Sequence, residues 1–417
     1  MRILAAALRK IRRGEFALSD KRPLTVLCIA SYEKGQEFMR ECKRQGCRVL
    51  LVTTAKLRDA DWPRESVDEF FYMPADFALD ALTRSVSYIA RTREIDRIVP
   101  LDDFDVETAA ALREHLRLPG MGDTTARYFR DKLAMRVKAR DGGILIPDFV
   151  HALNRERVRE FAERTPAPWV LKPRSEASAV GIKKVTSAEE LWPMLEELGD
   201  RQSFYLLEQF IAGDIFHVDS IVSESSVVFS AVSKYGKPPM EVAHGGGVFL
   251  TRTVSRRTED ARLLETLNRE LLRTLGLPRG VTHTEFIKGG DGRFYFLETA
   301  ARVGGANIAE VVEAATGINL WREWARVEIA GEGGQYEVPS VRDDYAGIVI
   351  SLARQEWPDT SGYDDPEIVF RLRKRHHVGL IVASHDPARV EQLLNSYARR
   401  LLEDFSATLP APDRPTS

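Results

Sequence analysis

The chain has 417 residues, of which 44% are hydrophobic and 29% charged, and its formal net charge is −2. This length predicts two to four domains, and the near-neutral charge gives no general attraction to nucleic acid or membranes. Cys28, Cys42 and Cys47 lack the spacing of a CxxC or zinc motif and indicate reduced thiols in a cytoplasmic protein. No apolar run reaches transmembrane length, and the basic segment 1–22 is expected to be flexible or a docked helix.

Residues 23–124 alternate between apolar strand-like runs and helical stretches. The strands are predicted at 24–30, 47–54 and 97–103, and helices at 37–45 and 106–116. This alternation predicts a parallel sheet with crossover helices, that is, an α/β domain. An acidic cluster follows the third strand, where open α/β sheets bind ligands, but acidic residues are equally expected at a helix N-terminus. The cluster comprises Asp102, Asp103, Asp105 and Glu107.

The rest of the chain is predicted to be α+β. Residues 125–207 form a small unit of short strands and helices, and residues 208–335 form a larger, strand-rich unit. A glycine-rich stretch at 330–340 is typical of a linker to a C-terminal lobe, 336–408, and 409–417 is expected to be flexible.

A hairpin is predicted at 283–300, because Asp291-Gly292 is the strongest short hairpin signal. With a two-residue loop, the facing pairs are His283 with Ala300, Glu285 with Glu298, and Ile287 with Phe296. Like charges directly opposite are destabilising, so one carboxylate must be protonated or a cation must lie between them. Paired carboxylates suit Mg²⁺, which completes its shell with substrate phosphates. The alternative is a solvated pair that repels weakly.

Three motifs precede the hairpin, and each places charged residues at a strand end, a helix start or one face of a strand. They are Asp131-Lys132 in "RDKLAMR", Lys172 before the small-residue loop 175–181, and Glu208 before a bend that leads to His217 and Asp219. Taken singly, they are also explained by snorkelling lysines, a strand-edge carboxylate and polar side chains facing water. Together with the hairpin and Arg302, in this order and at these spacings, they resemble the ATP-grasp superfamily over about residues 24–400. The biotin-carboxylase-like and amino-acid-ligase branches are the most similar.

The resemblance implies a site for ATP. Lys132 and Lys172 would hold the phosphates, and backbone N–H groups of the loop would close over them. The segment 208–211 would be a hinge whose backbone reads adenine, while Glu208 accepts from the exocyclic amine. The residues expected at the nucleotide are Lys132, Lys172, Ser178, Glu208, Gln209, Phe210, Ile211, His217 and Asp219.

The hairpin departs from the family pattern at one position. Relatives have a glutamate, a spacer and then Glu-x-Asn-x-Arg, and the corresponding residues here are Glu285, Glu298, Ala300 and Arg302. The two glutamates would hold Mg²⁺, and the alanine leaves a second magnesium ion one ligand short unless His283 substitutes. Arg302 would clamp the transferring phosphoryl group, and Gly304 and Gly305 would present N–H groups to an acyl phosphate.

The implied reaction is an ADP-forming ligation in which a substrate carboxylate is activated as an acyl phosphate and joined to an amine. Arg302 and Lys172 would be catalytic, with ATP and Mg²⁺ as cofactors. Residues 233–249 contain many turn formers and predict a substrate-side loop that carries Lys234, Tyr235 and His244. Carboxylation through carboxyphosphate and a non-catalytic nucleotide-binding module are the alternatives, the latter because of Ala300 and the glycine-poor loop. Small-molecule carboxylates and amines are the expected partners, without nucleic acid or membrane, and a homodimer is compatible with this interpretation.

Overall fold

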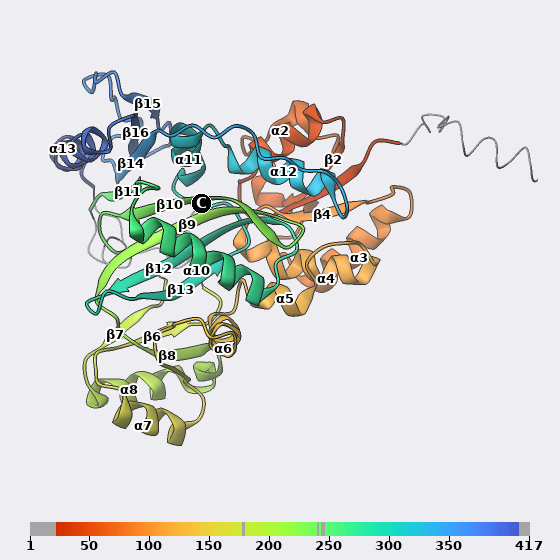
Figure 1. The fold of residues 1–417 in the computed structure, drawn as a ribbon. Coiled ribbons are helices and arrows are strands. Elements are labelled where there is room, and N and C mark those ends of the chain that lie inside the picture. Colours follow the sequence, from red (N-terminus) through yellow and green to blue (C-terminus); the bar gives the residue numbers. More distant parts are fainter. Residues whose placement is uncertain (1–21, 177–179, 240–241, 243–246, 408–417) are drawn as a thin grey trace, which may run out of the picture.

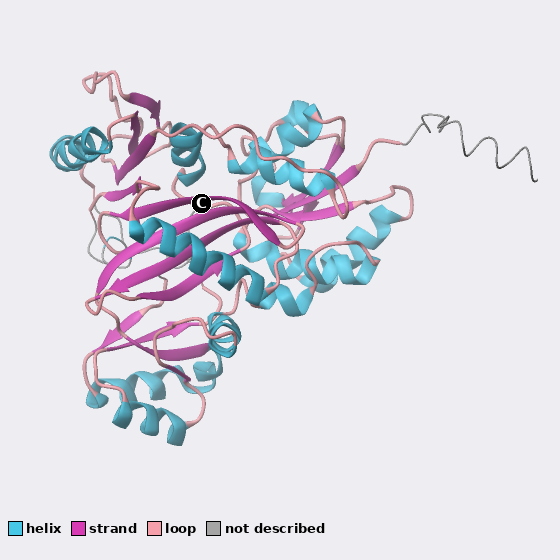
Figure 2. Cartoon of the chain, in the orientation of Figure 1, coloured by secondary structure: helices cyan, strands magenta, loops and turns pink. Residues whose placement is uncertain are grey.

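The computed structural model describes residues 22–176, 180–239, 242 and 247–407. Figure 1 shows a broad central sheet with the N-terminal unit on one side and a small lid-like unit below it. The described residues contain a parallel α/β unit followed by antiparallel sheets with helices packed against them (Figure 2), which confirms the predicted fold class. Within these residues, no helix combines the length and the apolar character that a membrane crossing requires.

The N-terminal unit is a four-stranded parallel sheet in the order β3-β2-β1-β4. Its elements are β1 (Thr25–Ala30), α2 (Gln36–Arg44), β2 (Arg48–Thr54), β3 (Glu69–Met73), α3 (Leu79–Ala90), β4 (Arg97–Pro100) and α4 (Val106–Leu116). All six residues of β1 are buried, because helices cover both faces of a parallel sheet. Strand β3 was not predicted, and its partly buried, edge position explains the weak pattern.

The lid unit is a second four-stranded sheet, antiparallel and in the order β5-β8-β6-β7. Its elements are β5 (Phe149–His151), α7 (Arg155–Arg164), β6 (Trp169–Pro173), β7 (Lys183–Val185), α8 (Ala188–Leu198) and β8 (Tyr205–Gln209). Two helices, α5 (Asp123–Arg127) and α6 (Lys132–Asp141), connect it to the N-terminal unit.

The central sheet has eight strands in the order β13-β12-β9-β10-β11-β14-β16-β15. These are β9 (Gly213–Ser223), β10 (Ser226–Tyr235), β11 (Phe249–Thr253), β12 (Gly280–Gly289), β13 (Phe294–Ala300), β14 (Tyr345–Leu352), β15 (Ile368–Arg371) and β16 (His377–Ser384). The pairing of β11 with β14 joins the C-terminal strands to this sheet. Residues 336–408, expected as a separate lobe, therefore share a sheet with the preceding unit.

Helices cover both faces of the central sheet. The helices are α10 (Glu259–Leu275), α11 (Ile308–Thr316), α12 (Leu320–Ala330) and α13 (Pro387–Phe405). On one face, α10 packs on a core that includes Phe216, Val218 and Phe286. On the other face, Ile221 and Val281 pack with α11, α12 and the N-terminal unit.

The hairpin β12–β13 differs from its predicted register at two compensating points. Its turn is a three-residue loop, because Gly289 N–H donates to the Arg293 carbonyl. This loop pairs Phe296 with Phe286 instead of Ile287, and a bulge at Leu297 then restores the predicted register. Both phenylalanines thereby enter the α10 core. Beyond the bulge, the predicted pairs His283 with Ala300 and Glu285 with Glu298 are confirmed.

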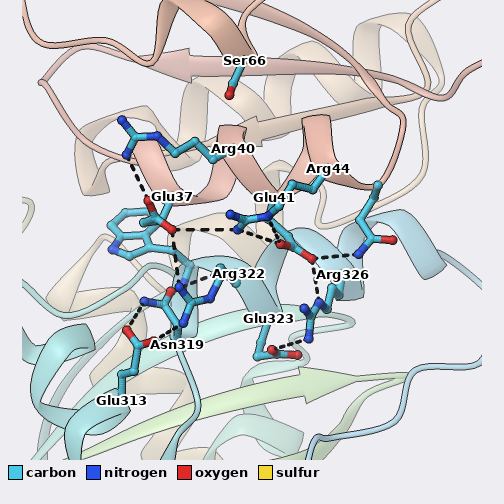
Figure 3. A network of polar contacts seen from close by, with 12 residues as sticks. Glu37, Arg40, Glu41, Arg44, Ser66, Glu313, Asn319, Arg322, Glu323 and Arg326 are labelled. Carbon is cyan, nitrogen blue, oxygen red and sulfur yellow. Dashed lines mark hydrogen bonds and ion pairs between the residues drawn. The ribbon is translucent and has the colours of Figure 1, made fainter.

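Helices α2 and α12 join the N-terminal unit to the central unit. Their apolar sides meet through Phe38 and Trp324, whose ring centroids lie 5.4 Å apart. Beside this contact, Arg326 Nε donates to Glu41 Oε1 at 2.7 Å, and Arg322 lies 3.5 Å from Glu37. Figure 3 shows Glu37 and Glu41 of α2 facing Arg322 and Arg326 of α12. Apolar packing and ion pairs together therefore fix the position of the first sheet.

Candidate active site

A pocket lies where the hairpin meets α6 and the turn after β4. Charged side chains from the three regions line it, including Asp103, Arg130, Lys132, His283, Glu298 and Arg302. The tertiary fold thus brings together residues from three predicted motifs and from the acidic cluster.

Glu285 and Glu298 face each other across the hairpin, and each has a separate partner. Glu298 Oε2 lies 2.9 Å from Lys132 Nζ, and Glu285 Oε1 accepts from the Tyr235 hydroxyl at 2.9 Å. Burial alone would raise the pKa of Glu298, but the nearby Lys132 ammonium outweighs it and lowers that pKa to about 2. The Lys132 ammonium and the Tyr235 hydroxyl, one beside each carboxylate, therefore offset the repulsion in this structure. The sequence had suggested a protonated carboxylate or a cation between the pair. Two adjacent carboxylates, one of them 37% exposed, form a donor set that fits Mg²⁺.

Lys132 is held at the start of α6. Asp131 caps the helix by accepting from the backbone N–H groups of Leu133 and Ala134. Lys132 itself is buried, and its ammonium also donates to the Glu176 carbonyl at 2.6 Å. The base of the loop that follows Lys172 is therefore tied to α6. Ser178, expected in that loop, lies outside the described residues.

Lys172 and Glu208 form a buried ion pair with a third residue that the sequence analysis missed. Glu208 accepts from Lys172 Nζ at 2.7 Å and from Arg136 Nε at 2.6 Å. Arg136 is fully buried, and its two terminal nitrogens have no hydrogen-bond partner within the described part of the chain. Its spacing from Lys132 could have identified it, since residues four apart share a helix face. Burial lowers the pKa of Lys172 to about 8, although Glu208 opposes this shift.

In the expected adenine-reading hinge, 208–211, several polar groups already form hydrogen bonds within the protein. Each Glu208 oxygen already accepts one hydrogen bond, from Arg136 or from Lys172. Gln209 N–H donates to the Asp148 carbonyl and Phe210 N–H to the Pro168 carbonyl. The Phe210 ring carries Lys184 at 4.0 Å from its centroid. Adenine recognition by 208–211 therefore needs a rearrangement of the lid and stays a prediction.

His217 and Asp219 lie beneath the pocket and do not line it. Asp219 Oδ2 bonds His217 Nδ1 at 2.6 Å, and Asp219 Oδ1 bonds His283 Nδ1 at 2.8 Å. His217 Nε2 also bonds the Thr251 hydroxyl at 2.7 Å. Both are almost fully buried and bonded to protein in this structure, and direct nucleotide contact by His217 and Asp219 stays a prediction. Their effect reaches the pocket through His283.

His283 is fixed from both sides. Burial would lower the pKa of His283, but the Asp219 carboxylate raises it to about 9. Its Nε2 lies 3.2 Å from the Tyr235 hydroxyl. Gly304 packs on this pair, because a Cβ there would lie 3.0 Å from His283 Nδ1 and 3.1 Å from Asp219 Oδ1. Gly304 is thus required for close packing, while Gly305 has open space around it.

The predicted substrate loop begins later than expected. Lys234 and Tyr235 belong to strand β10, so successive side chains point to opposite faces. Tyr235 joins the His283 network, whereas Lys234 pairs with Asp214 at 2.7 Å and lies over the Phe216 ring on the α10 side. In this structure Lys234 thus lies on the other face of the sheet from Tyr235, and its role at the substrate stays a prediction. His244 lies outside the described residues.

The turn after β4 carries an acidic side chain into the pocket. Asp103 Oδ2 lies 3.1 Å from Arg130 and 3.7 Å from Arg302, while its Oδ1 is buried with no partner among the described residues. Asp102 instead caps the turn and pairs with Lys34. Burial, and then Asp102, raise the pKa of Asp105 to about 7. The capping explanation thus holds for Asp102, while a ligand-binding role for the cluster stays a prediction.

The comparisons with known proteins agree with this geometry. Residues 39–120 match the ATP-grasp N-terminal domain family, and residues 165–310 match the ATP-grasp domain family. The chain belongs to the ATP-grasp superfamily.

Two curated relatives and one solved structure are similar to this chain. It is 26% identical over 248 residues to an L-arginine-specific L-amino acid ligase of Bacillus subtilis, covering 58% of this chain and 59% of that protein. It is 30% identical over 112 residues to a D-alanine–D-alanine ligase of Nitrosomonas europaea, covering 27% of this chain and 36% of that one. The fold resembles the crystal structure of an L-amino acid ligase from Bacillus licheniformis, with a TM-score of 0.74, 21% identity, and coverage of 93% of this chain and 98% of that one.

Proposed function

We propose that this protein is an ADP-forming ligase that joins a small carboxylate to an amine through an acyl phosphate. The observation that carries the proposal is the cross-strand pair Glu285 and Glu298, of which Glu298 lines one pocket together with Lys132 and Arg302. A carboxylate pair and convergent cations are the groups that phosphoryl transfer requires, because the reaction is catalysed by positioning and charge neutralisation.

The nucleotide phosphates would be bound by Lys132, Lys172 and Arg136. The two terminal nitrogens of Arg136 are buried without partners in the described structure, and Lys172 is held next to it by Glu208. A guanidinium with two free nitrogens suits a bidentate contact with a phosphate. Arg302 would neutralise charge on the transferred phosphoryl group, on the side where Asp103 orients it.

Glu285 and Glu298 would hold Mg²⁺. When bound, the metal would neutralise phosphate charge. Lys132 now pairs with Glu298, so the ammonium would be released toward the phosphates when that carboxylate takes a metal. His283 would orient Glu285, from which its Nε2 lies 3.5 Å, and we assign it no metal contact because Asp219 and Tyr235 already engage it.

Amino acids are the proposed substrates, which would serve as both the carboxylate and the amine. The names of the two curated relatives support this class, although the matches cover only 59% and 36% of their lengths. A cytoplasmic location and a homodimer stay predictions.

The proposal is tested by a screen of paired amino acids for ADP release with Mg·ATP. We expect ADP formation only when an acceptable pair is present, together with a condensed product detected by mass spectrometry. The matched control is Glu298→Gln, which should release no ADP above background. Tight ADP binding without turnover on any pair would favour the non-catalytic module, and bicarbonate-dependent release would favour carboxylation.

A further inference from the structure

A second pocket lies behind the active-site pocket, at the junction of the N-terminal unit with α12. The end of the hairpin separates the two pockets, since Ala300 and Arg302 line the first and Ala301 lines the second. Polar residues from α4, from the approach to β12 and from α12 line this second pocket, namely Arg113, Arg279, Trp324 and Glu328. None of these four belongs to the proposed ligase site.

The two arginines are buried but differ in their partners. Arg113 is 6% exposed and donates to the carbonyls of Ile98 and Met121, at 2.8 and 3.0 Å. Arg279 is 7% exposed, and its Nε and Nη1 have no partner among the described residues. Its Nη2 lies 3.4 Å from Glu332, whose side chain is 71% exposed, so this contact is a weak surface pair. A buried guanidinium is thus left incompletely neutralised, which is costly.

The charges around the pocket do not balance. Glu328 is the acidic residue in the described lining, and it accepts from Trp324 Nε1 at 3.1 Å. Two guanidinium groups therefore face one carboxylate. Burial lowers the pKa of Arg113, Glu328 opposes that shift, and Arg279 adds to it, so the two arginines are close enough to repel each other. A bound negative charge would relieve both the repulsion and the unpaired donors.

Glycines make room for this convergence of side chains. A Cβ at Gly331 would lie 2.2 Å from Arg97 Nη2 and 3.4 Å from Arg279 Nη1, and a Cβ at Gly120 would lie 3.0 Å from Arg113. Both glycines have positive φ, 65° and 131°, which other residues adopt only with strain. The backbone on both sides of the junction is therefore shaped around the guanidinium groups.

We propose that this pocket binds a small inorganic anion between Arg113 and Arg279. The anion would bridge α4 of the N-terminal unit to the start of β12, and would steady the Ala300–Arg302 segment from behind. A halide and a tetrahedral oxyanion share the required chemistry, since guanidinium donors bind both. The inference does not depend on the ligase reaction.

The first test locates the anion in crystals of the full chain with Mg·ADP, which occupies the nucleotide site. Crystals would be soaked in sodium bromide or in sodium selenate, both of which scatter anomalously. We expect an anomalous peak within hydrogen-bond distance of the Arg279 guanidinium with at least one of them, and the anion that gives it identifies the class. Peaks confined to the surface, or none with either anion, would overturn the proposal.

The second test measures thermal unfolding of the Mg·ADP complex against sulfate and bromide at constant ionic strength. At a concentration near one hundred times Kd, the bound anion should raise the Tm by about 2–3 °C. Arg279→Gln should abolish this rise, and Arg269→Gln, an exposed arginine on α10, should retain it. An equal rise in wild type and Arg279→Gln would contradict the assignment, and the wild-type crystals decide the case if that variant does not fold.

Discussion

Two of the charged junctions between the N-terminal unit and the central unit are built differently. Between α2 and α12 the charges are matched, as with Glu41, whose two oxygens accept from Arg44, Gln45 and Arg326 (Figure 3). At the active-site pocket the charges are left partly open. Asp103 Oδ1 and Arg302 Nε are buried without partners among the described residues.

This difference distinguishes an interface that holds two units together from a site that can bind a ligand. Matched charges beside an apolar contact hold two units together and have nothing left to offer a ligand. Buried polar groups without hydrogen-bond partners cost stability unless a ligand binds them, and such groups concentrate at functional sites. We therefore expect substitutions at the pocket to change activity and nucleotide binding, and substitutions between α2 and α12 to change stability.

The largest effect is expected for Glu298→Gln. The change removes a charge from the carboxylate pair without creating a cavity, so the rate of ADP formation should fall about 100-fold or more while unfolding is little altered. The rate would be measured with saturating Mg·ATP and a substrate pair that wild type accepts. Asp291→Asn, at the exposed turn of the same hairpin, is the matched control. Wild-type rates in Glu298→Gln would remove the hairpin from the chemistry.

Lys172→Met should weaken ADP binding about 10-fold or more, because a buried ammonium beside the phosphates is lost. Calorimetric titration gives the Kd, and Lys183→Met, on the exposed strand β7 of the same unit, should bind like wild type. Equal affinity in both variants would exclude Lys172 from the nucleotide site.

The same lysine predicts a pH dependence. Its pKa is about 8 in the free protein, and the protonated form is the one that attracts phosphate. The affinity for ADP should therefore be highest below this pKa and fall as the pH rises through it. In Lys172→Met the fall should be absent, so parallel pH profiles for the two proteins would contradict the assignment.

Glu41→Gln should act on stability alone. Its carboxylate is 2% exposed and bonded to Arg326 across the junction, so loss of the charge should lower the free energy of unfolding by about 1–3 kcal/mol. Urea unfolding measures this, and Glu65→Gln, whose side chain is 67% exposed, should stay within about 0.5 kcal/mol of wild type. A loss of activity without a loss of stability would mean that the contact between α2 and α12 contributes to catalysis and not only to stability.

The smallest effect is expected for Ala300→Asn. An added amide would supply the oxygen ligand that the family pattern has at this position, so the Mg²⁺ concentration for half-maximal ADP formation should fall a few-fold. Ala300→Gly adds no ligand and should leave this concentration unchanged. Reduced activity in Ala300→Asn would show that crowding of His283, which pairs with this position, outweighs the new ligand.

The hairpin and strand β9 show which features could be predicted from the sequence and which could not. The hairpin that carries Glu285 and Glu298 could be predicted, because turn residues and strand periodicity are local signals. The three-residue loop and the bulge at Leu297 could not, and the two glutamates face each other because the bulge cancels the register shift of the loop. His217 and Asp219 were correctly placed on one face, but only the assembled sheet showed that His283 on β12 and Thr251 on β11 occupy their polar atoms.

By itself, the sequence determined the alternation of strands and helices, the order of the motifs and the hairpin that carries the two glutamates. These depend on residues near one another in the chain, where periodicity, turn residues and capping act. The tertiary structure alone decided that Arg136 joins Lys172 at Glu208, that Asp103 meets Arg302, and that Lys234 faces away from the pocket. Those contacts join distant segments, and their geometry depends on how whole sheets and helices pack, which no local pattern encodes.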